Sequence, residues 1–486
     1  MIERPLRSLP FLGLGAILAA VLVSGDVPAT AQPAATAEAS NMRLVGHADL
    51  QGRSAYQPLV RKHGARWIAY VGHHGGQAVN PLTGVQEPNG TSLVDVTDPA
   101  DPRQLFHIPG APGGVESGGA QMVRVCEGAE LPRAARDRIY LLRTLGNLAH
   151  EVWDVTDPAS PAKVTTVVSG LAATHKNWWE CDTGIAYLVS DGRPQGWRTN
   201  RMTKIFDLGD PVEPRFIRDF GLAGQQPGAT GVAPDGVHGP IAYGDRVYLP
   251  YGTSQNGVLQ IVDRTRLLEG SPAVADRFAP TPANLAYPQI GRLDIAPAWG
   301  GHTSFPILGV PIADFAANSK YTVQDFVLLV SESIFNECQE VRHLSFLIDI
   351  TTPSKPFPIS SYQVPERAGE FCARGGRFGP HSSNESFTPI YYRKLVFIAY
   401  FNAGVRAVDI RDPYHPREAG FFIPAITDKT DVRCVKVDGA DRCKRAIQTN
   451  NVEVDERGLI YTADRANTGL HILELTGPAR AIARSD

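Results

Sequence analysis

A short phrase recurs along this chain and constrains its fold more than any other feature. An apolar run ends in an acidic residue, and a turn rich in aspartate and proline follows, as in "SLVDVTDPADP" and "VRAVDIRDPYHP". Neighbouring copies are separated by between 53 and 86 residues, and this regularity predicts a repeat architecture. Aligned on the acidic residue, the seven copies fall at Asp95, Asp154, Asp207, Asp263, Asp349, Asp409 and Glu474.

Each repeat has room for four short strands. Apolar runs such as "RIYLLRT" and "LVFIAYF" lie upstream of the acidic phrase, which we expect to end a third strand before an outer strand begins. The 47 glycines and 38 prolines favour many turns between short strands. These features predict an all-β fold, a seven-bladed β-propeller of four-stranded blades over residues 41–478. The longest spacing predicts an insertion in the fifth repeat, around residues 307–325.

The two ends of the repeat region complement each other. The seventh repeat stops at "LHILEL", with no outer strand after it. The segment "NMRLVGHADL" (41–50) resembles outer-strand pieces such as "PRQLFHIPG". We therefore expect residues 42–50 to supply the missing outer strand, so that the ring closes and no long strand edge stays exposed. Residues 479–486 form a C-terminal tail.

The N-terminus has the composition of a targeting segment. Arg4 and Arg7 precede an apolar run, and "ATA" offers a cleavage site before Gln32. Residues 1–31 are therefore expected to be a signal peptide and residues 32–40 a disordered lead-in. The apolar run is too short to anchor the chain in a membrane, so the mature protein is predicted to be periplasmic or secreted. The net charge of −3 gives no basic field for nucleic acid.

Six cysteines accompany this predicted export, which makes disulfides possible. None of them forms a CxxC pair, so thiolate zinc or thioredoxin-type chemistry is not indicated. The segment "CVKVDGADRC" reads as a hairpin joined by Cys434 and Cys443. Two further bridges, Cys126–Cys181 and Cys338–Cys372, would complete three, although the spacing alone leaves other connectivities open.

The apolar phrases ending in aspartate, with aspartate and proline after them, resemble those of the LVIVD-repeat family of secreted bacterial proteins. The resemblance covers nearly the whole chain after the targeting segment. It implies a propeller fold, but it implies little about function, because propellers carry many unrelated activities.

Four histidines stand at the same position of successive repeats. In a propeller the start of each innermost strand faces the central channel near one rim, and residues in this register become neighbours around the axis. The other repeats offer Tyr56–Gln57, Gly119–Gln121 and Asn450–Asn451 at this position. The histidines are those of "ATHKNWW", "GVHGPI", "GGHTSFP" and "GPHSSNE": His175, His238, His302 and His381.

Converging imidazoles without thiolates predict a transition-metal site. Imidazole is the commonest neutral metal ligand, and such a set favours iron or copper over zinc and disfavours Ca²⁺ and Mg²⁺. The inferred geometry is similar to that of carotenoid-cleaving oxygenases and of the selenium-binding-protein and methanethiol-oxidase family, although the sequence motifs of neither occur here. A single channel-facing histidine is more often a structural residue; four in one register favour metal binding.

Carboxylates near these histidines are candidates to orient them, because ligating histidines usually donate their second N–H to a carboxylate or carbonyl. The candidates are Glu180, Glu385, Glu332, Glu337 and Glu340. The aspartates of the repeated phrase are expected to form turns rather than to act in catalysis.

Three functions agree with this pattern. The first is a metal-dependent oxidoreductase acting on a small organic molecule. The second is a non-catalytic binding or surface-scaffold protein of the LVIVD type. The third is a metal-dependent hydrolase or lyase that uses a metal-bound water.

Overall fold

The computed structural model describes residues 36–312 and 322–484, and these form an all-β unit of antiparallel sheets. The predicted signal peptide, residues 1–31, lies outside the described residues. The helices are short: α1 (Arg264–Glu269), α2 (Pro282–Ala286) and α3 (Gly477–Arg484). None of the described helices has the length and apolar character needed to cross a membrane.

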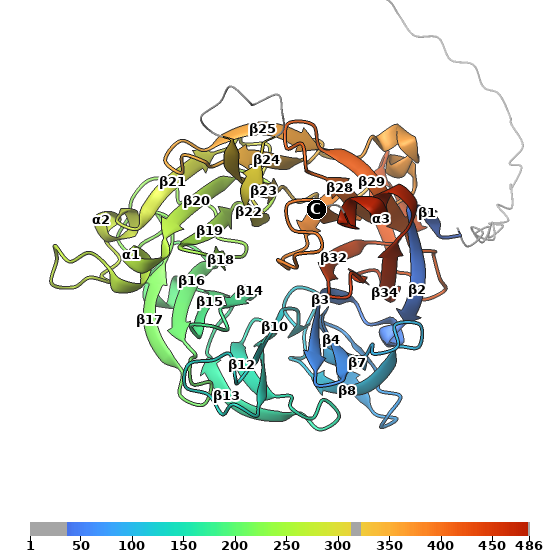
Figure 1. The fold of residues 1–486 in the computed structure, drawn as a ribbon, viewed down its shortest axis with the longest axis horizontal. Helices are drawn as coiled ribbons and strands as arrows, with labels where there is room; N and C mark the ends of the chain where they lie inside the picture. The colour runs from blue at the N-terminus through green and yellow to red at the C-terminus, as the bar shows by residue number, and fades with distance from the viewer. Residues whose placement is uncertain (1–35, 313–321, 485–486) are drawn as a thin grey trace, which may run out of the picture. The chain divides into compact units, whose positions relative to one another are not determined.

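Four of the sheets contain four strands each, and in each the strands pair in chain order. Figure 1 shows the first strand of these sheets toward the centre of the unit and the last toward its rim. Their bounds are β10 (Val123–Glu127), β11 (Ile139–Leu145), β12 (Ala149–Asp154) and β13 (Ala162–Val168); β14 (Thr174–Trp179), β15 (Ile185–Ser190), β16 (Met202–Asp207) and β17 (Arg215–Phe220); β18 (Ile241–Tyr243), β19 (Arg246–Tyr251), β20 (Val258–Asp263) and β21 (Gln289–Asp294); and β22 (Thr303–Pro311), β23 (Val323–Val330), β24 (Ser345–Asp349) and β25 (Phe357–Tyr362).

A five-stranded sheet adds one short strand to the same plan. It contains β3 (Ala55–His63), β4 (Arg66–His74), β7 (Gly90–Asp95) and β8 (Arg103–Pro109), with β9 (Gly119–Ala120) beside β4. Two small hairpins lie outside the larger sheets: β5 (Gln77–Val79) with β6 (Gln86–Pro88), and β30 (Val432–Val437) with β31 (Ala440–Arg445).

A nine-stranded sheet joins two further runs of strands. One run pairs β26, β27, β28 and β29 in that order, with β1 on its outer edge, and the other pairs β32, β33, β34 and β2. A single residue pair, Phe401 with Thr449, connects β27 to β32. The bounds are β1 (Glu38–Ser40), β2 (Met42–Ala48), β26 (Phe378–Ser383), β27 (Leu395–Phe401), β28 (Val405–Asp409), β29 (Arg417–Ile423), β32 (Thr449–Val454), β33 (Ile460–Asp464) and β34 (Gly469–Leu475).

The acidic residue of the repeated phrase ends the third strand of a run and forms the turn that follows. Asp95 Oδ1 accepts a hydrogen bond from the Thr97 amide at 2.9 Å, and Asp349 Oδ1 accepts one from the Thr351 amide at 2.8 Å. This side-chain bond to the backbone two residues on is the turn chemistry of aspartate. The same bond recurs at Asp154, Asp207 and Asp409.

Apolar side chains fill the space between neighbouring sheets. Ile68 and Tyr70 of β4 pack with Val123 of β10, and similar clusters lie between each later pair of strand runs. In a further cluster, Ala69 of β4 packs with Tyr461 of β33, so the last strand run contacts the first. The runs therefore surround a common centre (Figure 1).

The expected pairing of the N-terminal strand is confirmed for residues 42–48, whereas Leu50, at the end of the expected range, belongs to the short helix Leu50–Gly52. β2 pairs antiparallel with β34, from Met42 opposite Leu475 to Ala48 opposite Leu470. The disordered lead-in expected over residues 32–40 is wrong at its end, because Glu38–Ser40 forms β1 and pairs with β29. The strand propensity of this segment, which contains alanine, is low. It forms a strand because the open edge of β29 supplies hydrogen-bond partners for its backbone.

The insertion expected around residues 307–325 lies in part outside the described residues, which omit 313–321, and its two sides belong to the paired strands β22 and β23. The segment with α1 and α2, between β20 and β21, also contributes to the long spacing of this repeat. In the expected C-terminal tail, residues 479–484 belong to α3.

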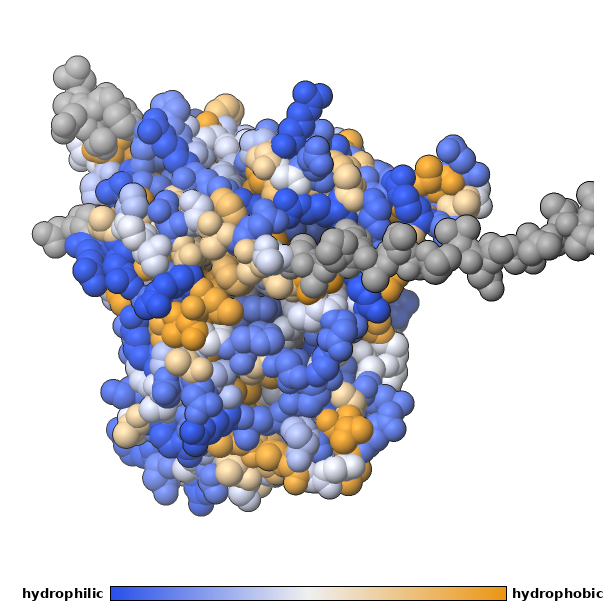
Figure 2. Space-filling view, turned by 90° about the vertical axis from the view of Figure 1, so that its right-hand side faces the viewer, coloured by the Kyte–Doolittle hydropathy of each residue, from blue (hydrophilic) through white to orange (hydrophobic). Residues whose placement is uncertain are grey.

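On the face shown in Figure 2, groups of hydrophobic residues are separated by hydrophilic ones. Exposed large hydrophobic residues such as Leu44 and Phe357 belong to outer strands, whereas the apolar core lies between the sheets.

Candidate metal centre

The four predicted histidines lie on or beside inner strands of different strand runs. His175 belongs to β14 and His381 to β26. His302 directly precedes β22, and His238 lies three residues before β18. Histidines that are far apart in sequence therefore lie close together at the centre of the unit.

The four imidazole rings form a continuous row. Ring centroids are 4.3 Å apart for His175 and His238, 3.6 Å for His238 and His302, and 4.3 Å for His302 and His381. The Nε2 atoms of His175 and His238 lie 2.7 Å apart. The structure therefore brings all four predicted residues together.

A local backbone feature explains the position of His381. Gly379 has φ +146°, and a Cβ atom there would lie 1.7 Å from Ser333 Oγ. Glycine thus allows β26 to pass close to the segment after β23, where the Ser333 amide donates to the Pro380 carbonyl at 3.1 Å. The "GPH" sequence fixes this close approach and sets His381 beside that segment.

Hydrogen bonds at Nδ1 determine how two of the rings face. His381 Nδ1 bonds to the Asn450 carbonyl oxygen, which can only accept, so Nδ1 carries the hydrogen and Nε2 has the free lone pair. His302 Nδ1 contacts Thr303 Oγ1 at 2.8 Å. Such outer contacts orient ligating imidazoles in metal sites.

All four rings are neutral at ordinary pH. Burial lowers the pKa of each well below 6.5, and nearby positive charges, including Lys176, act in the same direction. A neutral imidazole has the lone pair that a metal ligand requires. The four imidazoles can therefore coordinate a metal ion without first changing from the charged to the neutral form.

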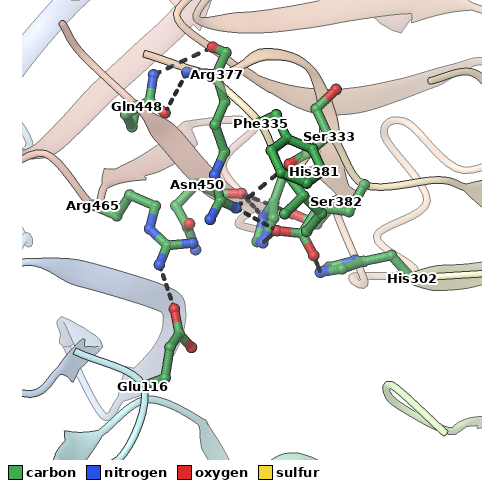
Figure 3. A network of polar contacts seen from close by, with 12 residues as sticks. Glu116, His302, Ser333, Phe335, Arg377, His381, Ser382, Gln448, Asn450 and Arg465 are labelled. Atoms are coloured by element: carbon green, nitrogen blue, oxygen red, sulfur yellow. Dashed lines mark hydrogen bonds and ion pairs between the residues drawn. The ribbon is translucent and has the colours of Figure 1, made fainter. Parts of the chain in front are cut away.

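Glu332, two residues past the end of β23, is the carboxylate closest to these rings among the candidates. Its oxygens lie 3.9 Å from His302 Nε2 and 3.7 Å from His381 Nε2, and it accepts a hydrogen bond from Arg377 at 2.9 Å. Burial raises the pKa of Glu332, and the charge of Arg377 opposes that rise. Figure 3 shows His302, His381 and Arg377 near one another.

The donor set fits a transition metal. Ligand atoms of His238, His302 and Glu332 lie within 4.8 Å of one another, and His302 Nε2 is buried without a hydrogen-bond partner among the described residues. Imidazole nitrogens at ~2.1 Å from one ion are about 3 Å apart at a right angle. The Nε2 atoms of His175 and His238, 2.7 Å apart, are close to that spacing, and a bound ion would give His302 Nε2 a partner.

Other residues of the predicted inner register surround the histidines. The Tyr56 hydroxyl lies 3.3 Å from His175 Nε2, and Asn450 supplies the carbonyl that orients His381. Burial, together with the negative charge of Glu332, raises the pKa of Tyr56 well above 10. Tyr56 therefore presents a protonated hydroxyl at the edge of the row.

The four carboxylates other than Glu332 make their contacts elsewhere. Within residues 36–312 and 322–484, none of their hydrogen bonds or ion pairs goes to a candidate histidine. Glu180 bonds to Arg264, Glu385 to Lys176 and Arg124, Glu337 to Arg442, and Glu340 to the Ile334 amide and His343. The role expected of Glu180, Glu385, Glu337 and Glu340 therefore falls to the Asn450 carbonyl, which sequence could not distinguish from any other backbone group.

A cavity of about 230 Å³ opens onto the histidines. Its lining includes Tyr56, His175, His238 and His381, together with several charged residues. Ile334 also lines the cavity. The loop that contains Ile334 lies beside the β30–β31 hairpin, because the Asn336 side chain donates a hydrogen bond to the Cys434 carbonyl.

The six cysteines form three disulfides, in the pairing expected from the sequence: Cys126–Cys181, Cys338–Cys372 and Cys434–Cys443. The second and third lie in the loop and the hairpin that meet beside this cavity. Cross-links restrict the motion of such segments. The two disulfides therefore restrict the motion of the loop and the hairpin beside the cavity.

A second cavity, of about 510 Å³, lies toward the far ends of the inner strands. Trp178 and Trp179 at the end of β14 line it, with Arg124, Glu385 and Glu453. The two cavities share no lining residue. The tryptophans therefore wall a space other than the one at the histidines.

Comparison with known proteins gives no independent assignment: the chain matches no family model and no curated protein.

Proposed function

We propose that this protein is an exported seven-bladed β-propeller that binds a transition metal through His175, His238, His302 and His381 and acts as an oxidoreductase on a small organic molecule. The row of four imidazoles, drawn from four successive strand runs, is the observation that carries the proposal. Iron or copper is favoured over zinc, because the set consists of imidazoles and one carboxylate without thiolate.

The propeller assignment, and with it the LVIVD-type resemblance, has support in the strand runs. Seven apolar clusters separate neighbouring runs, and one of these clusters joins the last run to the first. Strands that pair in chain order from centre to rim are typical of propeller blades. The three disulfides favour an oxidising compartment, which supports export.

The residues around the centre have separable roles in this proposal. A bound ion would supply Lewis acidity or electron transfer. The four imidazoles and Glu332 would hold it, and the Asn450 carbonyl would orient His381. The protonated Tyr56 hydroxyl is placed to donate a hydrogen bond to a molecule in the cavity.

The metal content of the purified protein tests this proposal. We expect parent protein to contain one transition-metal ion per chain, and His381→Ala to lose metal affinity steeply, by more than the ~10–100-fold typical of an outer-contact loss. Parent and variant should be prepared under identical metal supply and compared by elemental mass spectrometry, with melting curves to verify folding. A visible spectrum with redox titration then tests oxidoreductase chemistry.

His415→Ala is the matched control, because His415 is an exposed histidine whose ring bonds to Asp412 in a turn. It should retain both metal and stability. Equal metal content in all three proteins would refute the four-histidine site. A redox-inert ion in the parent would favour the hydrolase or lyase, and a metal-free parent would favour the binding or scaffold protein.

A further inference from the structure

The cavity above the histidines contains more positive than negative side chains. Three arginines line it, Arg201, Arg377 and Arg465, against two carboxylates, Glu116 and Glu332. One of the three guanidinium groups is therefore without a carboxylate to pair with in this cavity.

Ion pairs identify which of the three arginines this is. Arg377 donates to Glu332 at 2.9 Å, and Arg465 donates to Glu116 at 2.5 Å, a contact drawn in Figure 3. The Arg201 side chain makes no hydrogen bond or ion pair with any residue in 36–312 or 322–484, and its backbone carbonyl accepts from the Val237 amide at 3.1 Å. Arg201 is thus held beside His238 with its guanidinium free.

From this arrangement we infer that the substrate of the histidine site is a small organic monocarboxylate, whose carboxylate group binds Arg201. This inference rests on the proposed function for the part of the substrate that reacts. The carboxylate group itself binds through Arg201, whether or not a metal is bound.

Two properties of the cavity select this class of ligand. A guanidinium presents paired N–H donors that match the two oxygens of a carboxylate, and such charge-assisted pairs are strong in partly buried sites. The cavity, at about 230 Å³, is smaller than the roughly 300–1,000 Å³ that drug-sized ligands occupy. One unpaired guanidinium in a small space fits one carboxylate on a few carbon atoms.

Fluorine NMR of trifluoroacetate in the presence of the protein tests the inference. We expect parent protein to broaden the trifluoroacetate resonance and acetate to reverse the broadening, whereas the uncharged trifluoroacetamide stays sharp. Arg201→Gln should weaken trifluoroacetate binding at least about tenfold, because it removes a charge-assisted pair. Arg201→Lys retains the positive charge but not the paired N–H donors, so its affinity for trifluoroacetate should lie between that of the parent and that of Arg201→Gln.

Arg215→Gln is the matched control, because Arg215 is an exposed arginine on the outer strand β17, 3.8 Å from Glu213. It should bind trifluoroacetate as the parent does, and melting curves should show that every variant is folded. Equal binding by Arg201→Gln and parent, or equal binding of trifluoroacetamide, would overturn the inference. Displacement by sulfate as strong as that by acetate would reject a carboxylate in favour of inorganic anions.

The same measurement on protein as purified and after chelation separates this inference from the proposed function. Carboxylate binding with no metal in the parent would leave Arg201 as the anion site and reject the metal centre. Metal in the parent without carboxylate binding would retain the metal centre and reject the monocarboxylate.

Discussion

A chain that begins at Gln51 should aggregate, or melt far below a chain that begins at Thr36. The shorter chain lacks β1 and β2, so the edges of both β29 and β34 are exposed. It also loses Met42 and Leu50, which are buried in two different apolar clusters, and each such burial contributes about 1.5–3 kcal/mol to stability. Open edges add a route to intermolecular strand pairing.

A chain beginning at Asn41 separates the two strands. It keeps β2 with its six residue pairs to β34 but lacks β1 and the ion pair between Glu38 and Arg374. Its melting temperature should lie much nearer to that of the chain from Thr36. Thermal melting and light scattering of the three chains provide the measurement, and equal melting of the shortest and longest would contradict closure by β2.

The repeat made the strand order and the inner register predictable, because both depend on local chemistry that each copy carries. An aspartate such as Asp95 forms its turn with the amide two residues on, and the same bond follows the third strand in five of the strand runs. Alignment on that turn places His175 and His381 in one register. Their proximity in the structure follows from the repeat rather than from any histidine motif.

Features set by long-range contacts were not accessible in the same way. Glu332, Glu337 and Glu340 are close together in sequence, and only the approach of β26 to Ser333 places the first of them at the histidines. Arg201 is conspicuous only because other arginines of its cavity have carboxylate partners. The strand over residues 38–40 depends on the free edge of β29, which no local pattern reveals.

Glu453 should make the protein's stability depend strongly on pH. This glutamate of β32 is 2% exposed, and its carboxyl accepts from the Glu385 amide at 3.0 Å. Burial, together with the negative charge of Glu385, raises the pKa of Glu453 from 4.5 to about 8. Although burial opposes it, the charges of Lys176 and Arg124 lower the pKa of Glu385, so the neighbouring charge persists.

The direction of the pH effect follows from proton binding. The folded protein retains the Glu453 proton up to about pH 8, whereas the unfolded chain releases it above about pH 4.5. Its contribution to stability is therefore complete below pH 4.5 and is lost as pH rises to 8. At 1.36 kcal/mol per pKa unit, the loss is roughly 5 kcal/mol across this window.

Glu453→Gln cannot ionise, so the variant should match the parent near pH 5 and exceed its free energy of unfolding by several kcal/mol at pH 8.5. Urea denaturation at both pH values measures this difference, and other titrating groups such as Asp464 cancel because both proteins contain them. Glu456→Gln makes the same change at an exposed residue lining the same cavity and should show no such pH dependence. An advantage of Glu453→Gln that is equal at both pH values would mean that the Glu453 carboxyl is already ionised at neutral pH, with Gln57 and the Glu385 amide stabilising the anion. The same pH-dependent advantage in Glu456→Gln would mean that the effect does not come from Glu453.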